Sequence, residues 1–131
     1  LWAQPVPITI VPLDATNEVP VSMAFLERLA RLRRFPLADF AGQCWAQTVG
    51  TIPSYEYVYF MWDTLTTGYL GAPGLLRFET LPTAVDVAPP SAGRIRIAEG
   101  GRAVKCAVHA DAAGFHDYLL KLLARDPRRS G

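Results

Sequence analysis

The sequence lacks the features of several large classes of protein. Only 19% of its 131 residues are charged and the net charge is +1, so we expect no general attraction to nucleic acid or to a membrane surface. It contains no apolar run of about 18 residues and no charged-then-apolar signal segment. These absences predict a cytoplasmic protein without nucleic-acid or membrane partners.

Common metal-binding and nucleotide-binding motifs are also missing. The two cysteines, Cys44 and Cys106, lie far apart and outside any metal-type spacing, so we expect two buried, reduced thiols; whether they meet is left open. The two histidines, His109 and His116, form no metal-binding pattern. Without G-x-S-x-G, G-x-G-x-x-G or G-K-[ST], the sequence argues against acyl transfer at a nucleophile elbow, dinucleotide-dependent redox chemistry and P-loop chemistry.

Hydrophobic residues, in contrast, are plentiful and make up 50% of the sequence. A chain of this length and composition can bury a substantial core without disulfides or a metal. We therefore expect residues 1–131 to form a single domain, with a flexible tail at residues 126–131.

The first half of the sequence predicts a strand followed by helices. The β-branched run at residues 8–13 is typical of a buried strand, with a loop over residues 14–18 at its carboxyl end. Ser22 is placed to cap a helix that ends at Phe35-Pro36, and a second amphipathic helix follows. The residues at helical spacing, which we expect to be buried, are Phe25, Leu26, Leu29 and Leu32 in the first helix and Leu37, Phe40, Ala41, Cys44 and Trp45 in the second.

The second half changes to strand periodicity. Residues 76–81 alternate between apolar and polar, and residues 84–87 are consistent with a second short strand. Two further strands, 94–98 and 103–108, flank a glycine-containing turn and predict a β-hairpin. Asp111 is then placed to cap a closing helix, whose expected buried residues are Phe115, Leu119, Leu122 and Leu123. This order indicates a mixed α/β fold in which the opening strand needs a parallel partner, so we expect companion structure beyond this chain.

One acid, Asp63, lies in the aromatic stretch YFMWDTLTTGYL at residues 59–70. Buried in an unbroken helix, it would be costly without a partner. Alternatively, the chain breaks at Trp62 and Asp63 caps a helix that begins at Thr64, with a carboxylate oxygen free to reach a cation. Asp14, after the opening strand, is open to two similar interpretations: an ordinary Asx-type turn or a binding loop.

Two stretches resemble the nucleoside hydrolases, calcium-dependent enzymes that cleave the N-glycosidic bond of ribonucleosides. ITIVPLDATNEVPV, residues 8–21, resembles the family's recurring "VPLDVT" segment, and YFMWDTLTTGYL resembles its later "HDPLA" or "WDPLA" motif. The resemblance extends over residues 5–125 but covers only about the last third of the family's length. It implies the C-terminal portion of a mixed, mainly parallel nucleoside-hydrolase-type sheet with flanking helices and a β-hairpin, incomplete alone.

The resemblance also implies roles for individual residues. Asp63 corresponds to the calcium-ligating aspartate, and Trp62 stands where many members have a histidine proposed to assist the leaving base. Tyr59 and Trp62 would form the wall of the base pocket. The family's clustered N-terminal aspartates, which supply most calcium ligands and the base that activates water, have no counterpart here, so this chain alone has no catalytic residue and is predicted to be inactive.

The implied function therefore requires a partner. An N-terminal portion of the same enzyme, or a companion chain, would complete an enzyme of purine or pyrimidine salvage acting on ribonucleosides; the preferred base and assembly into a homo-oligomer are left open. The alternative is a non-catalytic relative that binds a partner or a sugar-like ligand through Tyr59, Trp62 and Thr64. A third interpretation is a piece that only completes a fold.

Overall fold

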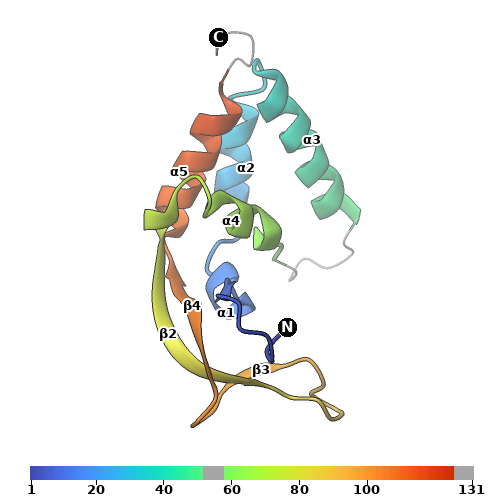
Figure 1. The fold of residues 1–131 in the computed structure, drawn as a ribbon. Coiled ribbons are helices and arrows are strands. Elements are labelled where there is room, and N and C mark those ends of the chain that lie inside the picture. Colours follow the sequence, from blue (N-terminus) through green and yellow to red (C-terminus); the bar gives the residue numbers. More distant parts are fainter. Residues whose placement is uncertain (52–57, 126–131) are drawn as a thin grey trace.

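The computed structural model describes residues 1–51 and 58–125. The predicted flexible tail at residues 126–131 lies outside this part. Most of the helices gather toward one end of the molecule and the sheet lies toward the other, with the short first helix beside the sheet (Figure 1). The helices are α1 (Leu13–Thr16), α2 (Met23–Ala30), α3 (Pro36–Thr51), α4 (Trp62–Gly68) and α5 (Ala112–Leu123), with a short 3-10 turn, η1 (Pro73–Leu75), before the sheet. The mixed α/β class predicted from the sequence is confirmed.

The sheet has four strands in the order β1-β4-β2-β3. They are β1 (Thr9–Ile10), β2 (Leu76–Val85), β3 (Ile95–Ile97) and β4 (Arg102–Ala110). The opening strand finds a parallel partner within the chain, because β1 pairs with β4 and places Ile10 opposite Cys106. The other two pairs, β2 with β4 and β2 with β3, are antiparallel.

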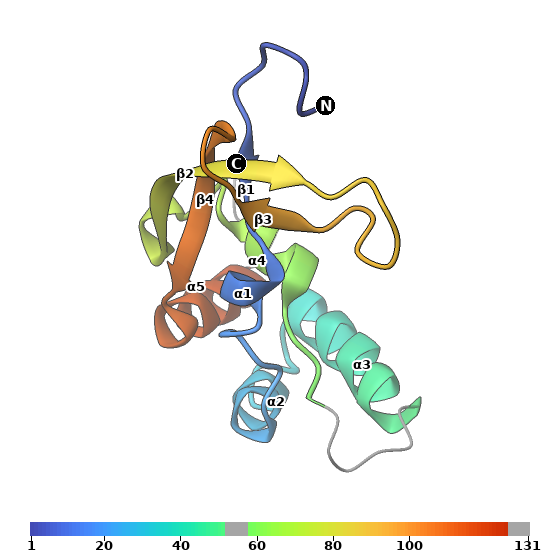
Figure 2. The same cartoon turned by 90° about the horizontal axis from the view of Figure 1, so that it is seen from below.

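The predicted hairpin between residues 94–98 and 103–108 is wrong. Both β3 and β4 pair with β2, and Thr83 of β2 lies opposite Ile97 on one side and Arg102 on the other. The chain therefore crosses from one edge of β2 to the other through the glycine turn. Gly101 is needed there, because a Cβ would lie 2.6 Å from the Thr83 carbonyl oxygen. The β2–β3 connection instead forms the loop that projects to one side in Figures 1 and 2.

Several element boundaries also differ from the predictions. β1 is limited to two residues, and β2 is one strand of ten residues rather than two short ones. The predicted loop after the first strand is instead the helix α1, whose first turn contains Asp14. Pro12 precedes it and its carbonyl accepts from Ala15 N at 3.0 Å. Because proline has no N–H to continue the strand pairing, the backbone turns into a helix at this point, and the Asx-turn interpretation of Asp14 is wrong.

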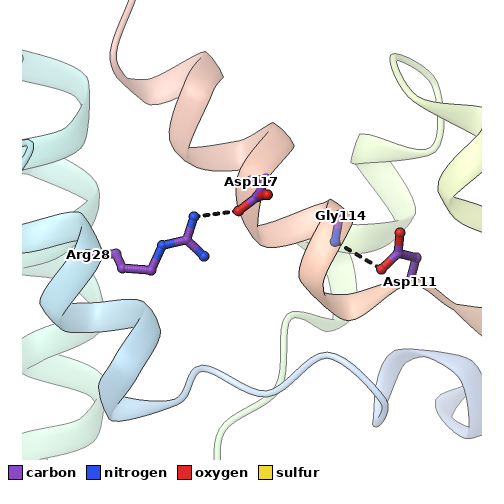
Figure 3. A network of polar contacts seen from close by, with 4 residues as sticks. All are labelled: Arg28, Asp111, Gly114 and Asp117. Atoms are coloured by element: carbon purple, nitrogen blue, oxygen red, sulfur yellow. Dashed lines mark hydrogen bonds and ion pairs between the residues drawn. The ribbon is translucent and has the colours of Figure 1, made fainter.

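The predicted helix caps at Ser22 and Asp111 are confirmed. The Ser22 hydroxyl accepts a hydrogen bond from Phe25 N at 3.2 Å, and the Asp111 carboxylate accepts one from Gly114 N at 2.9 Å (Figure 3). Figure 3 also shows the ion pair between Arg28 of α2 and Asp117 of α5. Local polar contacts thus begin these two helices, and α2 and α5 lie beside each other.

The expected apolar faces of α2 and α3 have different fates. Phe25 and Leu29 of α2 are each 1% exposed, as predicted. On α3, however, Leu37 is 45% and Phe40 69% exposed, and the helix packs through Ala38 and the predicted Trp45. The predicted buried face of α3 is therefore wrong at these positions.

The two thiols differ in the same way. Both cysteines are free, but Cys44 of α3 is exposed whereas Cys106 of β4 is buried. Burial raises the pKa of the Cys106 thiol. The expectation of two buried, reduced thiols is thus right for Cys106 and wrong for Cys44.

The core joins the sheet to the helices. Its largest fully buried side chains include Phe25, Phe115 and Met61. A methyl group at Gly68 of α4 would overlap the ring of Phe115, so the glycine allows α4 to lie directly on α5. Across residues 1–51 and 58–125, no helix combines the length and hydropathy that a membrane crossing requires.

Candidate functional site

The two stretches that carry the family resemblance lie side by side. Pro20 and Phe60 form an isolated antiparallel bridge. On either side of it, Val21 N donates to the Tyr59 carbonyl at 2.7 Å and Met61 N donates to the Val19 carbonyl at 3.0 Å. The segment after α1 and the segment before α4 therefore form one short ladder, which is consistent with both belonging to a single site.

Trp62, the first residue of α4, is fixed from two directions. Its indole Nε1–H donates to the Asn17 side-chain oxygen at 2.9 Å. Its ring also contacts Tyr59 edge to face, with centroids 5.0 Å apart and planes at 62°. The two residues predicted to wall a base pocket are thus in contact, and both are half-buried. Since the indole has one polar donor, already used by Asn17, the ring face is what it can offer a ligand.

Asp63 does not cap its helix. α4 begins one residue earlier than expected, at Trp62, with Met61 in the capping position and no side-chain cap. Asp63 lies in the first turn, where the positive end of the helix favours a carboxylate. Its side chain is exposed and, within the described residues, makes no hydrogen bond or ion pair. The capping interpretation is therefore wrong, and both carboxylate oxygens are available.

Asp63 and Trp62 face different surroundings. Asp63, Thr64 and Thr67 line a surface groove of about 430 Å³ whose other wall is α5, including Phe115 and Tyr118. Neither Trp62 nor Tyr59 lines this groove. Successive residues of a helix point about 100° apart, so adjacent positions on α4 serve different sides of it.

Among the described residues, Asp63 alone offers a free carboxylate at the position expected to bind a metal. No group of three or more histidine, cysteine, aspartate or glutamate residues comes together within residues 1–51 and 58–125. Calcium takes about six to eight oxygen ligands, so the free carboxylate of Asp63 could supply only part of a coordination shell. Asp14 is also exposed and lies in α1, which contacts α4.

A polar cluster beside the ladder could not be seen in the sequence. Glu18 Oε2 accepts a hydrogen bond from Ala110 N at 2.7 Å and lies 2.8 Å from His109 Nδ1. These partners lie at the end of β4, about ninety residues further along the chain, and no periodicity or motif connects them to Glu18. Their meeting follows from the parallel pairing of β1 with β4, which brings both carboxyl ends to one edge of the sheet.

His116 holds the same segment from the other side. Its Nε2 lies 3.0 Å from the Pro20 carbonyl, to which the ring can donate. The ring packs on Phe25 with centroids 4.7 Å apart. Burial lowers the pKa of His116; Arg28 also lowers it, whereas the Pro20 hydrogen bond and Asp117 act in the opposite direction. His116 therefore acts as a packed structural group within the described chain.

Comparison with known proteins identifies the fold. No family model matches the chain, and no curated protein does. Among solved structures, an inosine-uridine preferring nucleoside hydrolase from Bacillus anthracis matches 94% of this chain with 30% sequence identity and a TM-score of 0.82. The chain has the fold of the C-terminal part of a nucleoside hydrolase.

A second nucleoside hydrolase supports the same fold. A purine-preferring ribonucleoside hydrolase from Gardnerella vaginalis matches 91% of this chain with a TM-score of 0.64, at 17% identity. The chain spans only 38% and 40% of the lengths of these two nucleoside hydrolases. The resemblance predicted from the two sequence stretches is confirmed at the level of fold, with more than half of each enzyme lacking a counterpart here.

Proposed function

We propose that this chain is part of a calcium-dependent nucleoside hydrolase that cleaves ribonucleosides to ribose and free base. The observation that carries the proposal is the ladder between residues 19–21 and 59–61, which joins the two nucleoside-hydrolase-like stretches within a matching fold. The similar enzyme from Bacillus anthracis prefers inosine and uridine by its name. The chain alone is expected to be inactive, because the remaining ligands and the base must come from an N-terminal portion or a companion chain.

Asp63 is proposed to hold the calcium ion as one of several ligands. Its exposed carboxylate has no competing partner among the described residues and lies in the first turn of α4. When bound, calcium would supply a positive centre that orients water and the ribose hydroxyls. The chain's own contribution is to hold one ligand on a helix that is fixed by the core.

Trp62 and Tyr59 are proposed to wall the base pocket. The contact between their rings and the hydrogen bond to Asn17 restrict the rotation of the indole. An aromatic ring held in this way can stack on a nucleobase, but an indole does not act as a general acid or base near neutral pH. Trp62 would therefore affect base preference through stacking and would not protonate the leaving group.

A direct test uses the whole protein of which this chain is part. Ribose release from inosine and uridine should be lost on adding a calcium chelator and restored by excess calcium. Calcium binding measured by calorimetry should weaken at least about tenfold in Asp63→Asn, because one charged ligand is removed. The matched control is Asp39→Asn on α3, an exposed aspartate whose hydrogen bond is to Gln43.

Two results would contradict the proposal. Full ribose release in the presence of the chelator would exclude calcium dependence. Unchanged calcium affinity in Asp63→Asn would show that this carboxylate is not a ligand. If the whole protein binds calcium or a ribonucleoside but releases no ribose, the non-catalytic alternative would replace the hydrolase.

A further inference from the structure

The segment Asn17–Val21 is held by several parts of the molecule. Its middle residues form the ladder with the segment before α4, and the Pro20 carbonyl accepts from His116 of α5. Asn17, at one end, accepts the hydrogen bond from Trp62. Glu18 is the residue between that contact and the ladder, and its side chain reaches a different element, the end of β4.

Glu18 makes the stronger of the segment's side-chain attachments. One carboxylate oxygen accepts a hydrogen bond from a backbone N–H, that of Ala110, and also lies 2.8 Å from an imidazole nitrogen, that of His109. Hydrogen bonds to a charged acceptor are roughly twice as strong as those between neutral groups. The Glu18 side chain is 38% exposed, so water competes for part of this interaction but does not surround it.

We propose that Glu18 is a positioning residue that fixes the orientation of Trp62 through Asn17. With Glu18 attached to β4, the backbone at Asn17 has one direction in which to present its side-chain oxygen. That oxygen holds the indole nitrogen of Trp62, and the indole in turn contacts Tyr59. This inference rests on the proposed function for its effect on turnover, but its effect on Trp62 is independent of any reaction.

The orientation of Trp62 can be tested separately from the stability of the fold, because other residues also hold this segment. Val19 is fully buried and, with Val21, keeps the ladder in place without Glu18. His116 would still hold Pro20 through the hydrogen bond to its carbonyl. Removing the Glu18 carboxylate should therefore loosen the Asn17 end of the segment while the remainder stays packed.

The experiment observes the Trp62 indole N–H by NMR in the whole protein labelled with nitrogen-15. The resonance is assigned by its loss in Trp62→Phe. In Glu18→Ala we expect its hydrogen exchange to become about tenfold faster and its chemical shift to move, because a charged hydrogen bond restrains the segment. Glu18→Gln should restore most of the protection, since its amide oxygen can still accept from Ala110 N. The control Glu79→Ala, which removes an exposed carboxylate paired with Arg77 on β2, should change nothing.

The outcomes are distinct. An unchanged indole resonance and exchange rate in Glu18→Ala would overturn the proposal, as would an equal change in Glu79→Ala. If Glu18→Ala does not fold, Glu18→Asp, whose shorter side chain cannot span the same distance, provides the same test. Ribose release is measured in parallel: a protein without hydrolase activity whose indole responds to Glu18→Ala would retain the positioning role and reject the proposed function. With activity, kcat/KM should fall about tenfold in Glu18→Ala and recover in Glu18→Gln.

Discussion

Helices α2 and α3 differ in how much of their expected apolar face they bury. Both have apolar residues at helical spacing, yet α2 buries Phe25 and Leu29 where it contacts α3 and α5, whereas α3 leaves Leu37 and Phe40 exposed. Phe25 of α2 contacts both Trp45 and His116, with ring centroids 5.4 Å and 4.7 Å away. An amphipathic pattern therefore predicts a helix reliably, but burial depends on which neighbours the fold supplies.

The largest expected effect comes from truncating the two phenylalanines that represent this contrast. Phe25→Ala should lower the free energy of unfolding by about 3–5 kcal/mol, because it removes a 1% exposed ring and leaves a cavity. Phe40→Ala, at a 69% exposed position, should change it by less than about 0.5 kcal/mol. Urea denaturation of both variants measures the difference. Equal losses would mean that α3 is buried as deeply as α2.

A smaller loss of stability should distinguish two glycines, one with a neighbouring side chain where a Cβ would lie and one with free space there. Gly68→Ala places a methyl group against the Phe115 ring, which is fully buried and cannot move aside, so we expect a loss of about 1–3 kcal/mol. Gly74→Ala is the control, because nothing lies within 4 Å of its Cβ position. Thermal unfolding of the two variants gives the comparison. A neutral Gly68→Ala would show that α4 does not rest on α5 as closely as described.

The smallest effect concerns pH and the desolvated surroundings of α2. Burial lowers the pKa of His116 below its ordinary value of 6.5, so the unfolded chain takes up a proton more readily than the folded chain. This contribution to stability is complete above pH 6.5 and is lost as the pH falls from there toward the lowered pKa. His116→Gln, which can still donate to the Pro20 carbonyl, should reduce the fall in stability over that window.

If His116→Gln shows the same pH dependence of unfolding as the unaltered protein, the ring of His116 is not desolvated. The measurement is urea denaturation at a series of pH values on either side of 6.5. It also checks whether Phe25, on which the ring packs, lies in the closed environment that distinguishes α2 from α3.

Local chemistry made much of the fold predictable. Ser22 and Asp111 cap helices as expected, because a side-chain oxygen three residues before a free N–H satisfies it wherever the chain begins a helix. The stretches around Asp14 and Asp63 predicted a nucleoside-hydrolase-like fold, which the structural comparison confirms. The roles of Asp63, Trp62 and Tyr59 remain predictions.

The errors share a cause. The pairing of β3 with β2, the exposed face of α3 and the start of α4 at Trp62 all depend on residues distant in the sequence. A turn such as the one at Gly100 and Gly101 indicates that the chain reverses, but it does not say which strand lies alongside afterwards.

The sequence by itself determined the helices α2, α3 and α5, the caps at Ser22 and Asp111, and the two motif stretches, since these follow from contacts within a few residues. Only the tertiary structure decided that the stretches form a ladder, that Asn17 holds the Trp62 indole, and that Glu18 reaches Ala110 and His109. Those contacts join residues forty to ninety positions apart, and they form only because the parallel pairing of β1 with β4 and the packing of α4 on α5 bring the segments together.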